Sequence, residues 1–158
     1  RWLGDSSEPA AVIGLNSLGS LVWANRQPSR WPIPLMLLGG TLDLITPPLD
    51  EQVGVFSALA SHPASRVVVV EGASHFSPIR VGEPTAAQQN DDLFQLGEEL
   101  VGMDPISVQA VISFEVIDFL EAVANGLAAK ESQHFRRGDV RWHRLNRQAA
   151  EDLSIRFQ

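Results

Sequence analysis

The sequence predicts an α/β domain in which a parallel sheet is flanked by helices. Three continuous apolar runs, at residues 10–16, 33–39 and 66–71, lack the alternation of a strand with one wet face. Such runs are typical of parallel strands covered on both faces. Between the second and third runs, apolar residues recur at intervals of three or four, which predicts an amphipathic helix. Strand, helix and strand in this order form a crossover unit with parallel strands.

The helix between these strands carries start and stop signals. We expect it to begin with Thr46 as the N-cap and Pro47 in the first turn. The segment Ser61-His62-Pro63 should end it. Its buried stripe is predicted to contain four apolar residues, namely Leu49, Val53, Phe56 and Leu59.

A second, longer helix is predicted after Asp104, which would act as the N-cap with Pro105 in the first turn. Its expected buried face contains one polar residue among eight apolar ones: Val108, Val111, Ile112, Glu115, Val116, Phe119, Leu120, Val123 and Leu127. Residues 17–32 and 77–103 are expected to be mainly loop. The first of these loops contains Trp23 and Trp31.

Composition predicts one domain with a charged tail. A chain of 158 residues can bury one full core. Of the net charge of −7, residues 1–129 hold 5 basic and 15 acidic side chains, and residues 130–158 hold 7 basic and 4 acidic ones. The acidic body argues against nucleic-acid binding. We assign residues 1–129 to the domain and residues 130–158 to a basic C-terminal extension, expected to be solvated or frayed rather than bound to an anionic surface.

The sequence also argues against several other classes of protein. No apolar stretch approaches the roughly 20 residues of a membrane helix. The chain has no cysteine, which excludes disulfides, thiolate metal sites and a cysteine nucleophile within this segment. It begins at Arg1 without a methionine or a signal-peptide pattern, as a cut inside a longer chain would leave it. The cellular compartment is therefore not readable from the sequence.

Two residues placed just after predicted strands point to a function. Asp43 follows the run at 33–39, and His75 follows the run at 66–71. Loops at the carboxyl ends of neighbouring parallel strands gather at one edge of the sheet. A carboxylate there can accept the imidazole N–H, which fixes the tautomer and stabilises the imidazolium formed when the histidine takes a proton from a nucleophile. The pair predicts the acid–base half of a nucleophilic hydrolase.

Each residue alone has a simpler interpretation. His75 would be an ordinary loop histidine, and Asp43 would be a turn residue or a helix cap; their order and spacing together favour catalysis. Glu71 is an alternative partner for His75, while His134 and His143 are expected to face solvent. No histidine has a metal-site spacing to nearby carboxylates, so neither a metal nor a cofactor is implied. No phosphate-cradling glycine pattern follows a strand, which argues against nucleotide binding.

Both loops carry motifs of a known family. The segment Gly39-Gly40-Thr41-Leu42-Asp43-Leu44-Ile45-Thr46-Pro47 looks like the acid loop of an α/β-hydrolase, and Glu71-Gly72-Ala73-Ser74-His75-Phe76 looks like its histidine loop. Their order agrees with that of the fold. With residues 11–16, they resemble the C-terminal half of bacterial, especially cyanobacterial-type, hydrolases described as dienelactone-hydrolase-like or platelet-activating-factor-acetylhydrolase-like. The resemblance covers residues 10–80 and, loosely, the helix near 104–125.

The resemblance implies a partial α/β-hydrolase fold with only the C-terminal strands, and a serine ester hydrolase acting on a small-molecule ester. His75 would be the general base and Asp43 would orient it. An apolar acyl or leaving-group pocket would be lined by three aromatic residues, unless they only pack: Trp23, Trp31 and Phe76.

The nucleophile elbow, Gly-x-Ser-x-Gly, is absent from the sequence. The nearest segment, Gly14-Leu15-Asn16-Ser17-Leu18-Gly19, has one residue too many before the serine. The resemblance therefore implies that the serine, the first oxyanion donor and the early strands lie upstream, and that this chain alone is inactive. The alternative is a non-catalytic fragment or degenerate module that binds a partner, or itself, through an exposed sheet edge.

Overall fold

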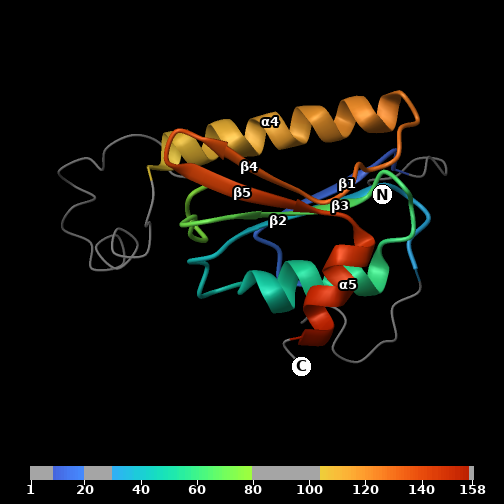
Figure 1. The fold of residues 1–158 in the computed structure, drawn as a ribbon, viewed down its shortest axis with the longest axis horizontal. Coiled ribbons are helices and arrows are strands. Elements are labelled where there is room, and N and C mark those ends of the chain that lie inside the picture. The colour runs from blue at the N-terminus through green and yellow to red at the C-terminus, as the bar shows by residue number, and fades with distance from the viewer. Residues whose placement is uncertain (1–8, 20–29, 80–103, 157–158) are drawn as a thin grey trace, which may run out of the picture.

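The computed structural model describes residues 9–19, 30–79 and 104–156 and has an α/β fold (Figure 1). Its elements, in chain order, are β1 (Val12–Leu15), β2 (Leu35–Gly40), the π-helical turn η1 (Leu49–Gly54), α2 (Val55–Leu59), β3 (Arg66–Val70), α4 (Pro105–Ala124), β4 (Gln133–Arg137), β5 (Val140–Leu145) and α5 (Arg147–Arg156). The five strands form one sheet in the order β1-β2-β3-β5-β4.

The first three strands are parallel, as the apolar runs predicted. β2 pairs with β1 on one side and with β3 on the other. The chain crosses from β2 to β3 through η1 and α2. Every residue of β2 is buried, because helices cover both faces of the sheet. The sheet as a whole is mixed, however, since β5 pairs antiparallel with β3 and with β4. The expectation of a wholly parallel sheet is therefore wrong.

The expectation of a solvated or frayed C-terminal segment is also wrong. β4 and β5 form a hairpin that turns at Gly138, whose φ is +60°. In β5, the buried Val140 and Trp142 alternate with the more exposed Arg141 and His143. This alternation of period two is typical of an antiparallel strand, and it places the hairpin on the same sheet as the parallel strands.

Side chains of β2 alternate between two cores. Met36 and Leu38 point to the core beneath α4, which also contains Phe119 and Trp142. Leu35 and Leu37 point to the opposite core, beneath η1, α2 and α5. Figure 1 shows α4 on one side of the sheet and the other helices on the far side. The sheet is thus the middle of three layers, and its strand ends are free to carry a site.

The crossover helix is present, but it begins differently from the prediction. Pro48 precedes η1 without any side-chain cap, and the Thr46 hydroxyl instead donates to Asp43. Three residues of the predicted stripe are buried, namely Val53, Phe56 and Leu59. The fourth, Leu49, is 40% exposed, whereas Glu51, Gln52 and Val53 of the same π-helical turn are buried, so the turn presents a different face to the core from the one predicted.

Helix α4 begins as predicted. The Asp104 carboxylate accepts hydrogen bonds from the backbone N–H groups of Ile106 and Ser107 and from the Ser107 hydroxyl, which lower the pKa of Asp104. Two residues predicted to be buried, Leu120 and Leu127, are exposed. The observed buried face is Val108, Val111, Ile112, Glu115, Phe119 and Ala122.

Glu115, the polar residue on that face, anchors the hairpin. Its buried carboxylate accepts two hydrogen bonds from Arg144, at 2.9 and 3.0 Å, and one from the Trp142 indole N–H at 2.7 Å. The exposed fraction is 0% for the Glu115 side chain and 4% for the Arg144 side chain. A charge pair this deeply buried is tolerated because both Glu115 oxygens accept hydrogen bonds from Arg144 and one also accepts from Trp142.

Asp118 extends this network to β3. It pairs with Arg144 at 3.2 Å and with Arg66. Partial burial alone would raise the pKa of Asp118, but the hydrogen bond from Arg66 and the positive charges of Arg144, Arg66 and Lys130 outweigh burial and lower it. Asp118 of α4 therefore connects this helix to Arg66 of β3 and to Arg144 of β5, two residues far from it in the sequence.

Candidate active site

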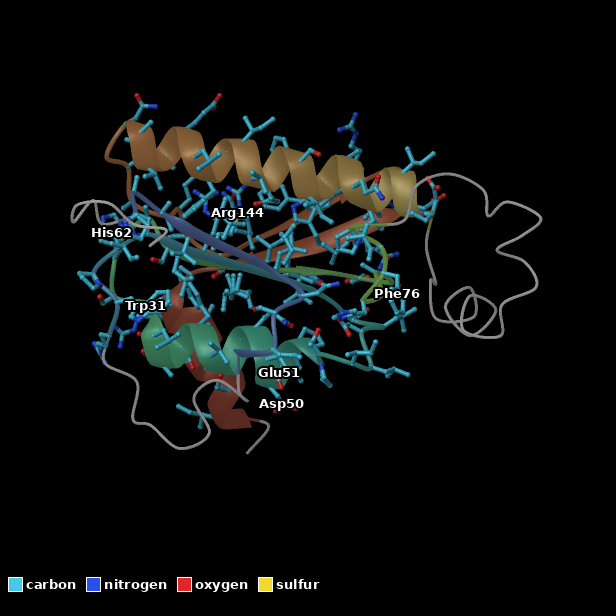
Figure 2. The ribbon with its side chains drawn as sticks, turned by 180° about the vertical axis from the view of Figure 1, so that it is seen from behind. Trp31, Asp50, Glu51, His62, Phe76 and Arg144 are labelled. Atoms are coloured by element: carbon cyan, nitrogen blue, oxygen red, sulfur yellow. The ribbon has the colours of Figure 1, made fainter. Side chains whose placement is uncertain are left out.

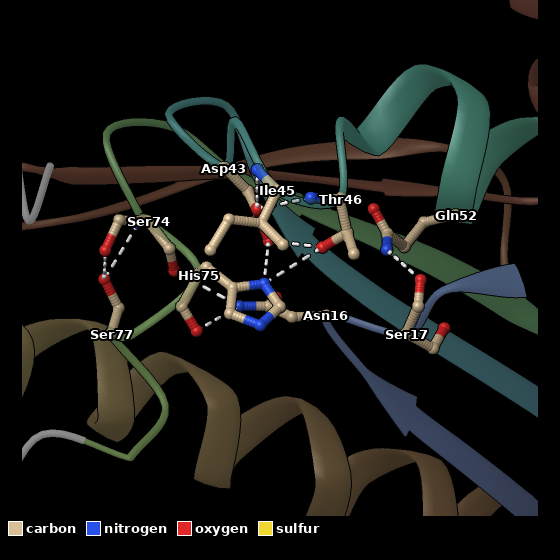
Figure 3. Close-up of polar contacts among 9 residues, drawn as sticks. All are labelled: Asn16, Ser17, Asp43, Ile45, Thr46, Gln52, Ser74, His75 and Ser77. Atoms are coloured by element: carbon tan, nitrogen blue, oxygen red, sulfur yellow. Dashed lines mark hydrogen bonds and ion pairs between the residues drawn. The ribbon is translucent and has the colours of Figure 1, made fainter. Parts of the chain in front are cut away.

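The acid loop and the histidine loop leave the carboxyl ends of two adjacent parallel strands. The pairing of β2 with β3 continues past the strands, since the Thr41 N–H donates to the Val70 carbonyl at 3.0 Å. Asp43 and His75 meet directly above this edge (Figure 3), with His75 Nδ1 3.0 Å from Asp43 Oδ2. The predicted contact between these two side chains is confirmed, whereas their catalytic roles remain a prediction.

The carboxylate of Asp43 is held rigidly by its own loop. Its side chain is fully buried. Oδ1 accepts hydrogen bonds from the backbone N–H groups of Ile45, at 3.0 Å, and Thr46, at 2.7 Å. Oδ2 accepts from the Thr46 hydroxyl at 2.6 Å and faces His75. Donors to both oxygens fix the orientation of the carboxylate.

The imidazole of His75 is fixed on one side and accessible on the other. Its side chain is 27% exposed, and the Phe76 ring packs edge-on at a centroid distance of 5.5 Å. Because Asp43 accepts at Nδ1, that nitrogen carries the proton and Nε2 is left as the acceptor. Among the described residues, Nε2 has no hydrogen-bond partner. The ring is therefore arranged to take a proton from a group that approaches Nε2.

Two glycines allow close packing at the end of β2. A Cβ on Gly40 would lie 2.1 Å from the Ala73 carbonyl oxygen, and a Cβ on Gly39 would lie 2.4 Å from the Gln52 side-chain oxygen. The Leu42 N–H also donates to the Ala73 carbonyl at 2.9 Å. Each glycine of the acid-loop motif thus has its own steric reason: the histidine loop lies against Gly40, and the Gln52 side chain of η1 lies against Gly39.

Asn16 contacts the histidine loop and is a site residue that the sequence analysis did not identify. It follows β1, and its side-chain Nδ2 donates to the carbonyls of Ser74, at 3.2 Å, and His75, at 2.8 Å. The loop is further closed by Ser77, whose hydroxyl accepts from the Ser74 N–H at 2.9 Å. An Asn directly after a strand is the one signal in the sequence that could have indicated this role.

The predicted aromatic lining is corrected in part. Trp31 bridges to Ala60 and packs against the core beneath α2, at the amino ends of β2 and β3. Figure 2 shows Trp31 and Phe76 at opposite ends of the molecule, so Trp31 does not line the site. Its position before β2, rather than after it, is the reason. Phe76 does lie beside His75, and Trp23 lies outside the described residues.

Glu71 does not compete with Asp43. Glu71 follows β3, and its carboxylate pairs with His143 Nε2 of β5 at 2.7 Å, whereas the His75 ring contacts Asp43. His143 thus has two partners, Glu71 and the exposed His134 on β4, and does not simply face solvent. The expectation for His143 was wrong because it treated the hairpin as a frayed tail.

No serine in the described residues completes a triad. The Ser17 carbonyl accepts from Gln52 Nε2 at 3.0 Å, and no described serine hydroxyl hydrogen-bonds to His75. The described residues also contain no cluster of three or more His, Asp or Glu residues suited to a metal ion, and no helix with the length and hydropathy to cross a membrane.

Comparisons with protein-family models, with curated proteins and with solved structures found no match to this chain.

Thr46→Val is expected to weaken the site by removing the hydroxyl that donates to Asp43 Oδ2. A buried hydrogen bond to a charged group contributes about 1.5–3 kcal/mol, so the free energy of unfolding should fall by that amount in a urea titration. Thr46→Ser is the matched control because it keeps the hydroxyl. Equal stability of the two variants would show that the hydroxyl does not hold the carboxylate.

Proposed function

We propose that this chain supplies the triad acid and histidine of a serine ester hydrolase of α/β-hydrolase type. The observation that carries the proposal is the contact between His75 Nδ1 and a fully buried Asp43 carboxylate at the carboxyl edge of parallel strands. The nucleophilic serine would come from polypeptide outside these 158 residues.

Each residue has a defined role in the proposed reaction. The serine Oγ attacks the ester carbonyl while His75 Nε2 takes its proton, and Asp43 stabilises the resulting imidazolium. His75 then gives the proton to the leaving alkoxide, which produces an acyl-enzyme. In the second half, water attacks the acyl group with His75 again acting as base. The parallel arrangement of β1, β2 and β3 supports the resemblance to the C-terminal strands of an α/β-hydrolase. The β4–β5 hairpin lies outside the proposed resemblance.

Apolar side chains around the dyad support an ester with an apolar acyl or leaving group. Leu44 and Ile45 lie between Asp43 and Thr46 and are 73% and 48% exposed. They are held outward because the loop backbone is fixed by its hydrogen bonds to Asp43. Phe76 adds an aromatic ring beside His75. These side chains take the place of Trp31 in the proposed pocket wall.

A fluorophosphonate serine probe tests the proposal. The complete reading frame that encodes this chain should be labelled at a serine outside these residues and should hydrolyse para-nitrophenyl esters, whereas the 158-residue chain alone should not be labelled. Ser17→Ala in the complete protein is the control and should leave labelling unchanged. Labelling of the isolated chain at Ser17 would contradict the assignment of the nucleophile, and a complete protein without labelling or turnover would contradict the hydrolase.

The second candidate is a non-catalytic binding module. Among the described strands, β1 forms an edge of the sheet; Leu15, its last residue, is 42% exposed, and Leu18, three residues later, is 45% exposed. An unpaired edge with apolar neighbours favours association with another chain or with a second copy. This function is favoured if the complete reading frame contains no reactive serine, and self-association through this edge remains a prediction.

A further inference from the structure

We propose that Asn16 is a positioning residue that fixes the backbone of His75 so that its ring meets Asp43. The catalytic consequence rests on the proposed function, whereas the positioning itself can be measured in this chain alone. Asn16 lies at the end of β1, is 8% exposed, and joins segments that are 58 and 59 residues apart in the sequence.

The two hydrogen bonds from Asn16 reach the peptide groups on both sides of His75. The Ser74 carbonyl belongs to the peptide bond before His75, and the His75 carbonyl belongs to the one after it. Holding both peptide planes fixes the φ and ψ angles of His75 and therefore the direction of its Cα–Cβ bond. Asp43 then needs only to orient the ring. Asn16 fixes the backbone conformation of His75, and Asp43 fixes the orientation of its imidazole ring.

The main chain of Asn16 is itself tied to the sheet. Its N–H donates to the Leu38 carbonyl of β2 at 2.8 Å. Its φ is +46°, and it is the only non-glycine residue with a positive φ among the described residues. Asn and Asp adopt this left-handed region more readily than other side chains. The turn directs the amide away from the β1 ladder and toward the histidine loop.

The hydrogen bonds of the Asn16 side chain, within the described residues, go to the histidine loop. Oδ1 of Asn16 is buried and has no hydrogen-bond partner among the described residues. Rotating the amide by 180° would turn Oδ1 toward two carbonyl oxygens, which would repel it. A buried unpaired oxygen destabilises a fold and is uncommon.

Two substitutions separate the amide from the backbone conformation. Asn16→Gly removes both hydrogen bonds but tolerates the positive φ, so the chain should stay folded. Asn16→Asp keeps the size and the φ tolerance but sets a carboxylate against two carbonyl oxygens. Asn125→Gly is the matched control, because Asn125 Nδ2 also donates to a backbone carbonyl, that of Glu121 at 2.7 Å, at the exposed end of α4.

The measurement is ¹⁵N NMR of histidine side chains in the 158-residue chain, with the His75 signals assigned from a His75→Gln variant. We expect the Nδ1–H tautomer of His75 in the wild type and in Asn125→Gly, and a mixture of tautomers in both Asn16 variants. Wild-type His75 signals in Asn16→Gly and Asn16→Asp would overturn the proposal. If one variant fails to fold, as judged by circular dichroism, the other decides.

Kinetics of the complete protein separate this inference from the proposed function. A misplaced catalytic group costs about 100-fold in rate, so Asn16→Gly should lower kcat by about that factor while KM changes by no more than about twofold. An altered tautomer in Asn16→Gly, together with unchanged turnover in Asp43→Asn, would support positioning and contradict the hydrolase. An unaltered tautomer with lost turnover in Asp43→Asn would support the hydrolase and contradict positioning.

Discussion

Replacing His75 with Ala, or Asp43 with Asn, in the complete reading frame is expected to lower the turnover of para-nitrophenyl esters by about 100- to 10,000-fold. A positioned general acid–base contributes this much to the rate, and the histidine does so only in the tautomer that Asp43 selects. Asp43→Asn is the gentler substitution, because its amide oxygen can still accept from the backbone N–H groups of Ile45 and Thr46. The loss should appear in kcat, since neither group is proposed to bind the substrate.

Residues of the same types away from the site provide controls. His62 accepts from the Ala64 N–H at the start of β3, and Asp50 is an exposed residue of η1. His62→Ala and Asp50→Asn should therefore retain full turnover. Unchanged turnover in the His75 and Asp43 variants, with circular dichroism matching the wild type, would remove both residues from the mechanism.

Glu115→Ala is expected to be the most destabilising single change in the described fold. It leaves the Arg144 guanidinium buried without its bidentate partner, and it removes the acceptor of the Trp142 indole N–H. Breaking a buried ion pair by removing one partner costs about 3–5 kcal/mol. The free energy of unfolding from urea titration should fall by that amount, a large fraction of the stability of a small domain.

Two variants make this result specific. Glu121→Ala removes an exposed carboxylate from the same helix and should change stability by less than about 0.5 kcal/mol. The double variant Glu115→Leu with Arg144→Met replaces the pair by apolar side chains and should recover most of the loss. A cost of Glu115→Ala no larger than that of Glu121→Ala would contradict the role of this pair in holding the hairpin to α4.

The central strands and the dyad were predictable from the sequence because their signals are local. Strands β1, β2 and β3 read as continuous apolar runs since both faces of the sheet are covered. The contact between Asp43 and His75 followed from two loops leaving adjacent parallel strands. In each case a short segment carries the information, and the rule that parallel strands end at one edge supplies the rest.

The hairpin was not predictable in the same way. Strand β5 contains Arg144, which reads as a surface residue until its partner Glu115 is known, and that partner lies 29 residues earlier on α4. The alternation of Val140 and Trp142 with charged neighbours is a weaker signal than an apolar run. Pairings that depend on distant residues leave no local pattern.

Site residues outside the dyad show the same limit. Thr46 reads as a helix cap, yet its hydroxyl donates to Asp43. Asn16 reads as the end of a strand, yet it reaches a loop 58 residues further on. For Trp31 the sequence left pocket lining and packing open, and the structure shows packing at the amino ends of the strands. Side-chain partners across loops are decided by tertiary structure rather than by residue type.

The most direct measurement is the ¹H–¹⁵N NMR signal of the His75 imidazole in this chain, compared with the Asp43→Asn variant. The structure predicts that the wild-type proton resides on Nδ1 and is protected from exchange by Asp43, and that both properties are lost in the variant. Identical His75 signals in the two proteins, or a wild-type proton on Nε2, would contradict the contact on which the proposed chemistry depends.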